Sequence, residues 1–333
     1  VTEIPVSGIY TMDPQFVTYH YQGQQVGENK GQVKVRYVNQ EGVDISPEVS
    51  ATGNGLFGSP YTTEEKEIDH YQFIDVDPAG ASATGFYTAT QQIVTYRYQG
   101  EDVGEAGKIT VNYKNQAGTM LATESFTGIY GLTYNLSTDN NGVLLKEFEH
   151  YTRNELPGNA VGTITDVPQT ITLTYTGDQV GNNIGRVTAK YLDLEGVAIS
   201  PEVDANGDGL FGSIYTTEQK VIENYEFVGI EAEYAPPTGF YKETPQTVIY
   251  RYQGRDVSEE GKITIEYRNQ IGKLLDKAYI TGRYGQTYNL ETDQNGSLLK
   301  TFENYTRDTL PENASGTISD TPQTIIVTYT GNQ

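Results

Sequence analysis

One nine-residue stretch occurs five times in this chain, and its spacing constrains the fold more than any other feature. The copies begin at Gln15, Gln92, Gln169, Gln246 and Gln323, each 77 residues after the last. In residues 92–100, Val94, Tyr96 and Tyr98 alternate with polar side chains, and glycine ends the stretch as a flexible stop. Alternation with a period of two predicts a strand with one buried face and one face toward water. A fixed period of this length predicts an array of small modules.

Alignment of the copies divides the chain into a fragment and four modules. Residues 1–27 match the C-terminal end of a B-type module, and four modules follow: A1 (28–103), B1 (104–180), A2 (181–257) and B2 (258–333). A2 and B2 repeat A1 and B1 at an offset of 154 residues without a gap. Residue 1 falls inside a repeat, and no signal peptide or sorting tail is visible. We therefore expect a piece of a longer chain.

Each module is expected to contain a small mixed sheet. In A1 the alternating residues 33–37 predict a first strand, residues 45–50 and 71–76 predict further strands, and residues 92–100 close the unit. Residues 62–66 carry a Thr-x-x-Glu capping box, which predicts a short helix. If the first and last strands pair in parallel, the connection must cross over the sheet. The predicted class is α+β, mostly β, with tandem β-grasp (ubiquitin-like) modules; an antiparallel sandwich is the rival.

The charge and composition exclude several classes of partner. The net charge of −22 disfavours nucleic acids and anionic membrane surfaces, because both require lysine and arginine. No apolar run of 18 or more residues exists, so no membrane insertion is expected within this fragment. The absence of cysteine excludes disulfides, zinc–thiolate sites and thiol catalysis. Modules this small have marginal cores, so either neighbouring modules support one another or a metal or a covalent cross-link helps.

Histidine gives no support for catalysis. The chain has three histidines, His20, His70 and His150, and the latter two correspond to Asn224 and Asn304 one A–B pair later. A catalytic or metal site built on histidine would not be expected to change in this way, and surface positions explain all three. Carboxylates are plentiful, but near-identical tandem copies suit multivalent binding or length better than a single active site. We therefore predict that the chain is not an enzyme.

One loop resembles a calcium loop. Residues 204–209 read Asp-Ala-Asn-Gly-Asp-Gly, so Asp204, Asn206 and Asp208 have the spacing of calcium ligands. The twelfth position is Tyr215 and not the bidentate glutamate, and the equivalent loop of A1 has no carboxylate. We predict that no cofactor is needed, with these three residues as the candidate for a metal and a polar turn as the alternative.

Tyrosine is the aromatic residue on which the cores depend. Tyr96, Tyr98, Tyr250 and Tyr252 lie on the predicted inner face, where their rings supply area that tryptophan does not. Other tyrosines lie in predicted loops, where exposed rings would be able to stack on sugars: Tyr87, Tyr130, Tyr234, Tyr241 and Tyr284.

Several stretches together resemble a known family. They are a first strand that ends in tyrosine before a polar turn (191–196), Tyr-Thr-Thr (215–217), Tyr-x-Phe (225–227), Asn-Ala-x-Gly-Thr (159–163 and 313–317) and the closing strand. In this order and recurrence they resemble the mucin-binding (MucBP-type) repeats of Gram-positive surface adhesins, over nearly the whole chain. The B modules depart from the pattern because they lack Tyr-Thr-Thr and carry an insert around Asn140 and Asn295.

The resemblance implies β-grasp-like modules that stack into elongated, monomeric rods outside the cell, attached to the cell wall in the parent protein. It implies host mucin glycoproteins or their glycans as partners, and because some members bind immunoglobulin, that partner stays open. No ligand-binding residue is carried over, so these residues are unknown. The leading hypothesis is an adhesin repeat region. The alternatives are a non-binding stalk that projects a distal adhesive head, and capture of immunoglobulin or another protein by strand addition.

The repeat also predicts a shape. At about 3.3 Å per strand residue, a module with its loops should measure roughly 40 Å, and four in a row roughly 150 Å. Short linkers and repulsion between acidic modules favour the extended form. Small-angle scattering should give this maximum dimension, and a value of roughly 70 Å, typical of a compact particle, would contradict the rod.

Overall fold

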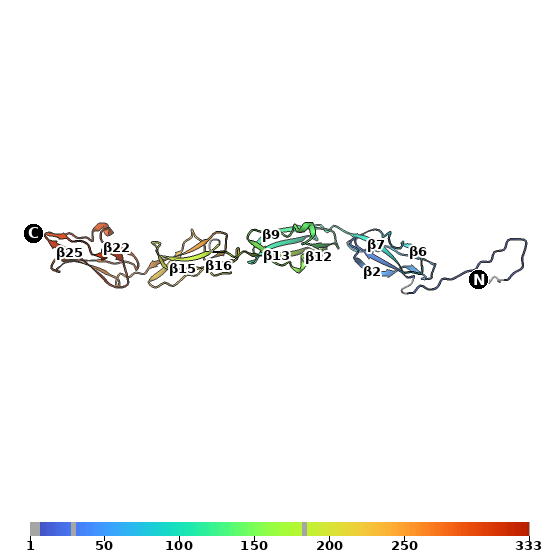
Figure 1. Ribbon diagram of the computed structural model, residues 1–333, viewed down its shortest axis with the longest axis horizontal. Coiled ribbons are helices and arrows are strands. Elements are labelled where there is room, and N and C mark those ends of the chain that lie inside the picture. The colour runs from blue at the N-terminus through green and yellow to red at the C-terminus, as the bar shows by residue number, and fades with distance from the viewer. Residues whose placement is uncertain (1–6, 28–30, 182–184, 333) are drawn as a thin grey trace. The chain divides into compact units, whose positions relative to one another are not determined.

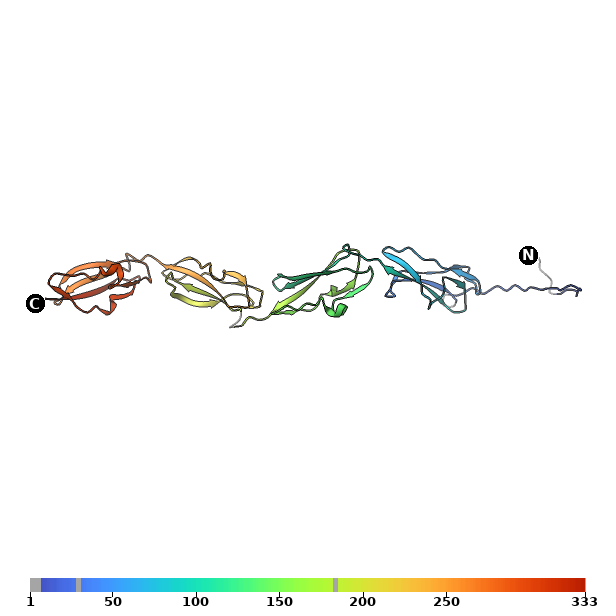
Figure 2. The same ribbon diagram turned by 90° about the horizontal axis from the view of Figure 1, so that it is seen from above.

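The computed structural model describes residues 7–27, 31–181 and 185–332. The chain forms two compact units. The first consists of residues 1–114, 120–146 and 155–174, and the second of residues 115–119, 147–154 and 175–333. Module A1 lies in the first unit, A2 and B2 lie in the second, and B1 contributes to both. Figures 1 and 2 show that each module gathers its own group of strands.

Module A1 is built on a four-stranded sheet in the order β2-β1-β7-β5, with a smaller sheet β3-β4-β6. Its strands are β1 (Val33–Val38), β2 (Asp44–Ser50), β3 (Thr52–Gly53), β4 (Pro60–Thr62), β5 (Tyr71–Val76), β6 (Thr84–Phe86) and β7 (Gln92–Gly100). The central strands β1 and β7 are parallel, with Val33 opposite Gln92. The edge strands β2 and β5 are antiparallel to their neighbours.

Module A2 repeats this arrangement. Its large sheet has the order β15-β14-β19-β17, and its small sheet pairs β16 with β18. The strands are β14 (Val187–Leu192), β15 (Ala198–Asp204), β16 (Ile214–Thr216), β17 (Tyr225–Ile230), β18 (Thr238–Phe240) and β19 (Gln246–Gly254). The register is the same as in A1, since Val187 lies opposite Gln246 in the parallel pair.

The B modules have the same large sheet, in the order β11-β13-β8-β9 in B1 and β21-β20-β25-β23 in B2. B1 contains β8 (Ile109–Asn115), β9 (Met120–Phe126), β10 (Thr133–Asn135), η1 (Asp139–Gly142), β11 (Tyr151–Arg153), η2 (Gly158–Ala160), β12 (Val161–Thr163) and β13 (Gln169–Gly177). B2 contains β20 (Ile263–Asn269), β21 (Leu274–Ile280), β22 (Thr287–Asn289), η3 (Asp293–Gly296), β23 (Tyr305–Arg307), η4 (Glu312–Ala314), β24 (Ser315–Thr317) and β25 (Gln323–Gly331).

The predicted pairing of first and last strands is confirmed. These strands are neighbours in the large sheet of every module, and their register is parallel in A1, A2 and B2. The rival antiparallel sandwich is therefore wrong. The mostly-β class is confirmed as well.

The predicted capping-box helix is wrong. Residues 63–67 form no helix, and the helices of the described residues are 3-10 turns of three or four residues, none of which is able to span a bilayer. Core tyrosines hold this segment extended. The Tyr37 hydroxyl donates to the Glu64 carbonyl, and the Tyr98 hydroxyl bonds both the N–H and the carbonyl of Lys66. These bonds satisfy backbone groups that a helix would have satisfied internally.

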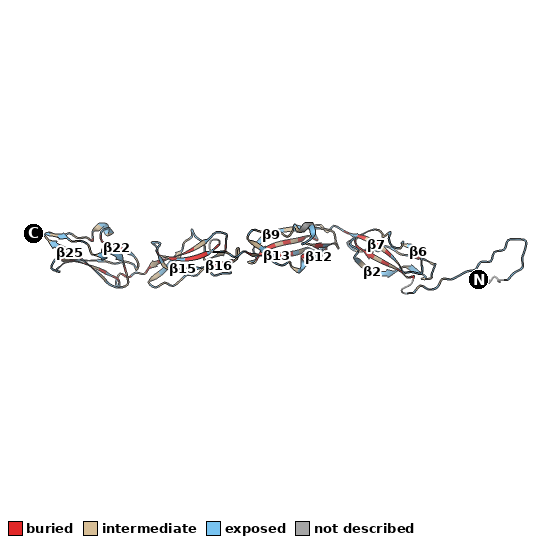
Figure 3. Ribbon diagram, viewed as in Figure 1, coloured by how far each residue is buried: buried red, intermediate tan, exposed pale blue. Residues whose placement is uncertain are grey.

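The core of each module lies between the large sheet and this crossing segment. In A1 it contains Val33, Val35, Tyr37, Tyr61, Tyr87, Val94, Tyr96 and Tyr98. Figure 3 shows buried residues concentrated along central strands such as β7 and β13. The four tyrosines expected on the inner face, Tyr96, Tyr98, Tyr250 and Tyr252, are all at most 3% exposed, which confirms the alternation argument.

The first copy of the repeated strand lies in the opening fragment (1–23), which lacks its own module, so we expect it to be loosely held or to pair with an exposed edge of another chain. Residues 15–23 form no strand, and Phe16, Tyr19 and Tyr21 are exposed. Within the described residues, no neighbouring strand hydrogen-bonds with this segment. The other four copies lie between two neighbours. Alternation alone therefore does not make a strand, because the ladder hydrogen bonds and the burial come from the neighbours.

Alkaline pH should destabilise the modules. Burial raises the pKa of Tyr267 to about 12, and burial also raises the pKa of Tyr37, Tyr98, Tyr191, Tyr252 and Tyr329. Above pH ~10 the unfolded chain releases tyrosine protons that the folded chain retains, so stability present below that pH is lost as pH rises toward about 12. Each tyrosine should contribute a loss of up to about 1.4 kcal/mol per pH unit. Urea unfolding followed by circular dichroism measures this, and constant stability up to pH ~11.5 would contradict it.

Candidate functional site

A hollow of about 280 Å³ opens beside the small sheet of A1. The segment before the module forms one wall, where the Gln25 side-chain amide donates to the Gly55 carbonyl at 2.9 Å. The lining residues come from that segment, the start of β1, the end of β2, β3 and the loop after it, and the first residue after β6: Gln25, Val26, Gly27, Gln32, Val33, Ser50, Ala51, Gly53, Asn54, Gly55 and Tyr87. Most of the lining groups are amides, hydroxyls and backbone.

Module A2 has the same hollow, also of about 280 Å³, at the equivalent positions. Gln179 takes the place of Gln25 and donates to the Gly209 carbonyl at 2.8 Å. The chemistry of the lining differs, since Gln32, Ser50 and Asn54 of A1 correspond to Arg186, Asp204 and Asp208 of A2. The two hollows thus have the same shape, but at these three positions the described lining is neutral in A1 and charged in A2.

A buried tyrosine contributes to each hollow. Tyr87 and Tyr241 are both 5% exposed, and their hydroxyls have no hydrogen-bond partner among the described residues. Each hydroxyl lies close to a glycine. A Cβ at Gly53 would be 2.7 Å from the Tyr87 hydroxyl, and one at Gly207 would be 2.8 Å from the Tyr241 hydroxyl. Burial and the nearby carboxylates of Asp208 and Asp204 raise the pKa of Tyr241, so its hydroxyl keeps its proton at neutral pH.

The three calcium candidates lie around this hollow in A2, where other groups already engage the carboxylates. Asp204 accepts from the Arg186 Nε at 2.6 Å. Asp208 accepts from the Leu210 N–H at 3.0 Å and also from the Ser213 hydroxyl. Asn206 pairs through its backbone with Thr216. The Asp208 bonds are those of a polar turn, and Asn54 makes the equivalent bonds in A1. Weak or absent calcium binding stays a prediction.

Two of the histidines occupy a special backbone position. His70, His150, Asn224 and Asn304 all have φ between 62° and 66°, in the left-handed region. Asparagine and histidine are among the non-glycine residues enriched there, which explains the exchange between them across the repeats. His70 stacks on Tyr130 at 4.5 Å, and His150 is partly buried beside Phe211. The predicted surface position is confirmed for His20 and His70, which are exposed, and is wrong for His150, which is partly buried.

The loop tyrosines do not form the exposed set that the sequence predicted. Tyr87 and Tyr241 are buried at the hollows, while Tyr130 and Tyr284 are partly buried where consecutive modules meet. Tyr234 alone of the five is an exposed ring, at 49%. A tyrosine that follows a turn is predicted to lie in a loop, and no local sequence signal indicates that its ring turns inward.

Consecutive modules are joined by one repeated contact. A ring of the following module packs edge-on against a tyrosine at the start of an edge strand: Tyr130 on Tyr71, Phe211 on Tyr151, and Tyr284 on Tyr225, at 5.3 to 5.5 Å. The glycine that ends the closing strand lies against the same ring residue, because a Cβ at Gly100, Gly177 or Gly254 would be 1.9 Å from its carbonyl oxygen. These glycines are therefore required because a side chain would clash with the next module, and not because the strand needs a flexible end.

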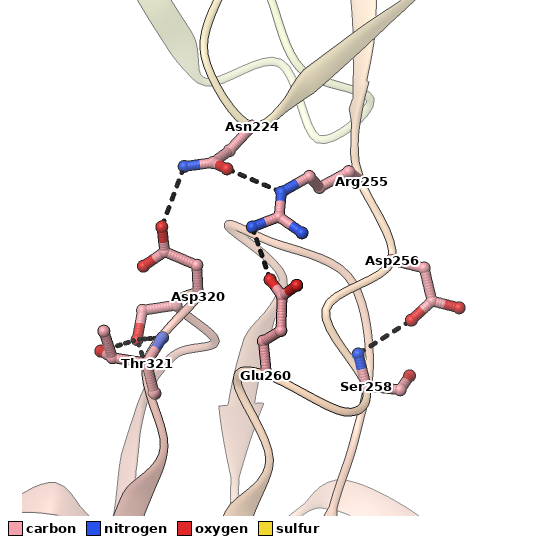
Figure 4. A network of polar contacts seen from close by, with 8 residues as sticks. Asn224, Arg255, Asp256, Ser258, Glu260, Asp320 and Thr321 are labelled. Atoms are coloured by element: carbon pink, nitrogen blue, oxygen red, sulfur yellow. Dashed lines mark hydrogen bonds and ion pairs between the residues drawn. The ribbon is translucent and has the colours of Figure 1, made fainter.

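Polar contacts reinforce the A2–B2 junction (Figure 4). The Asn224 side-chain oxygen accepts from the Arg255 Nε at 2.7 Å, and its Nδ2 donates to Asp320 at 3.3 Å. Arg255 also pairs with Glu260 at 2.7 Å. Backbone bonds complete the junction, since the Arg255 N–H donates to the Asn224 carbonyl and the Tyr284 N–H to the Arg255 carbonyl.

Comparison with protein families identifies the chain. The model of the MucBP domain matches residues 32–99, 108–176, 186–253 and 262–330. Because these matches cover more than half of the sequence, the chain belongs to the MucBP domain family. The family suggested by the sequence motifs is thus confirmed.

The chain is also similar to longer bacterial proteins. It is 33% identical over 302 residues to Internalin J of Listeria monocytogenes serotype 4b, a match that covers 90% of this chain and 30% of that protein. It is 28% identical over 224 residues to Internalin I of the same strain, covering 66% and 11%. The chain thus spans about a third or less of these relatives. The solved type 2 repeat of the mucus binding protein MUB from Lactobacillus reuteri matches at 15% identity, covering 43% of this chain and 97% of that one, and its TM-score of 0.18 carries no structural argument.

Asn224→Gly should loosen the A2–B2 junction. Glycine keeps the left-handed backbone but removes both side-chain bonds. Hydrogen exchange of the Arg255 and Tyr284 amides should accelerate at least about tenfold, as expected from the loss of hydrogen bonds of about 1 kcal/mol each. Asn304→Gly is the matched control, since Asn304 has the same backbone conformation and no side-chain hydrogen bond among the described residues. Equal exchange in the variant and the parent would contradict this role.

Proposed function

We propose that this chain is a repeat region of a bacterial surface adhesin whose modules bind mucin-type glycoproteins. The observation that carries the proposal is the fourfold consecutive match to the MucBP domain. The name of the mucus binding protein, whose repeat is among the matched structures, supports the same class of partner. The proposal includes an extracellular location, attachment to the cell wall in the parent protein, a monomeric state, and no enzymatic role or required cofactor.

We also infer that the modules are a form of the β-grasp fold without its helix. The mixed sheet with a central parallel pair supports this assignment. The extended crossing segment stands in the place of the helix.

Repetition makes weak sites effective. Linked modules that each bind a glycan weakly gain by effective concentration, so that avidity can exceed single-site affinity by about 10²–10⁴. Mucins present many copies of the same glycans, which is the arrangement that tandem sites exploit. The net charge of −22 disfavours binding through acidic groups, and this points to neutral parts of the glycans.

The junction contacts favour a second function, a stalk. Each junction joins consecutive modules by a ring contact, a glycine and backbone bonds, and these features stiffen a spacer whether or not the modules bind anything. A stalk would show no affinity for mucin.

The test is binding of the intact chain to immobilised mucin before and after enzymatic removal of its O-glycans. We expect binding to the untreated mucin only. Binding to immobilised immunoglobulin is measured in the same way. If it occurs, we expect strand addition at the open edges of the large sheets. No binding to untreated mucin would contradict the proposal and favour the stalk, and binding that survives deglycosylation would contradict the glycan as its target.

A further inference from the structure

The hollows of A1 and A2 carry a more specific inference. We propose that each is a subsite for one neutral pyranose ring, a hexose or an N-acetylhexosamine, in which the hydroxyl of Tyr87 or Tyr241 bonds a sugar hydroxyl. This inference rests on the proposed function, because it names the part of the glycan that is recognised and the place where it binds.

The size of the hollows fits a single ring. Sites for drug-sized ligands measure about 300–1,000 Å³, so a hollow of about 280 Å³ lies at the lower limit of that range. One sugar ring is the glycan element of that size, and a longer oligosaccharide would have to extend out of the mouth.

The tyrosine hydroxyls are the clearest sign of where a ligand would bind. A polar atom that lines an open hollow and bonds no protein group is available to a ligand that enters the hollow. Tyr61, in the same core, donates to the Ser82 carbonyl at 3.0 Å, and Tyr215 donates to the Pro236 carbonyl at 3.0 Å. The hydroxyls of Tyr87 and Tyr241 have no such partner among the described residues and lie at the hollow wall. A phenol hydroxyl both donates and accepts, as a sugar hydroxyl requires.

The remaining lining supports a polyhydroxylated ligand. In A1, Gln32 and Ser50 make only a long contact of 3.4 Å to each other, which leaves donors and acceptors available at the mouth. By contrast, Gln25 is committed to the Gly55 carbonyl and Asn54 to its own turn, so these residues build the wall. The lining thus combines side chains that are committed to the wall with two, Gln32 and Ser50, that make only one long contact.

The two modules differ in charge, and this determines which sugars are accepted. The A2 hollow has two carboxylates, Asp204 and Asp208, and one guanidinium, Arg186, which is paired with Asp204. An acidic sugar would meet an uncompensated carboxylate there. Among the described residues that line the A1 hollow none is charged, so these residues offer no cation to an acidic sugar either. Both hollows therefore favour neutral rings.

The experiment is saturation-transfer NMR and titration of the intact chain with three probes: methyl β-galactopyranoside, methyl N-acetyl-α-galactosaminide and the methyl glycoside of N-acetylneuraminic acid. We expect saturation transfer to at least one neutral probe, with affinity in the millimolar range typical of weak single sites, about 1 mM, and none to the acidic probe. Tyr87→Phe/Tyr241→Phe should weaken the neutral probe about tenfold. Its thermal unfolding should stay unchanged, since these hydroxyls bond no described group.

Tyr61→Phe/Tyr215→Phe is the matched control. It removes two core hydroxyls that bond carbonyls, so it should lower the unfolding temperature and leave the affinity unchanged. Ser50→Trp/Asp204→Trp blocks both hollows from exposed positions and should abolish saturation transfer without relying on the tyrosines. Absence of saturation transfer to both neutral probes, equal binding of the acidic probe, or full affinity in both test variants would overturn the subsite.

The outcomes separate this inference from the proposed function. If mucin binding depends on O-glycans but is unchanged in both test variants, the hollows are not the subsite and the adhesin proposal stands. If the variants lose the neutral probe while the parent chain does not bind mucin, the subsite stands and mucin is the wrong partner.

Discussion

The structure depends on hydrogen bonds between tyrosine hydroxyls and the segment that crosses each sheet. Without tryptophan, cysteine or an α-helix among the described residues, a module must cover its sheet with extended chain, whose backbone groups need partners. Tyr98 and its counterpart Tyr252 supply them at Lys66 and Lys220, and Tyr37 and Tyr191 do so at Glu64 and Glu218. Each of these rings adds apolar area to the core while its hydroxyl fixes the chain above it. The two A cores are therefore alike in their bonding although many of their other residues differ.

The closing strand of a module also takes part in the junction with the next module. The last strand of a module ends in a glycine that admits the carbonyl of a ring residue in the next module, so the strand that completes one core also positions the following unit. A side chain at that glycine would overlap a carbonyl oxygen, and the ring contact would be lost with it. A module of this size has little core of its own, and support from its neighbour compensates. The left-handed residues His70, His150 and Asn224 lie at the same junctions, where the rings of His70 and His150 pack against Tyr130 and Phe211.

The sequence predicted the parts of the fold that follow from periodicity. The 77-residue repeat and the alternation of Val94, Tyr96 and Tyr98 predict the strands and buried faces of the complete modules, whereas the same alternation at residues 15–23 forms no strand and the parallel pairing had a rival. The capping box at 62–66 predicts a helix that does not form, because hydrogen bonds from core tyrosines to this segment outweigh its local helix preference. The site is less accessible to prediction: the spacing of Asp204 and Asp208 indicates candidate metal ligands, whereas the hollow that they border also depends on Gln179, Gly207 and Tyr241, which lie elsewhere in the sequence. No local pattern states which tyrosine hydroxyl is left without a partner.

Duplication explains why one hollow exists in two chemical versions. The bonds that shape it are the same in both A modules: an amide to a glycine carbonyl, an Asx oxygen to the next turn, and a tyrosine held against glycine. The residues at the mouth contribute little to those bonds, so Ser50 and Asp204 are free to differ without cost to the core. Under the proposed function, the two A modules would present related but unequal sites to a ligand that is itself repetitive. Such a set of sites gains avidity from their number and selectivity from their differences.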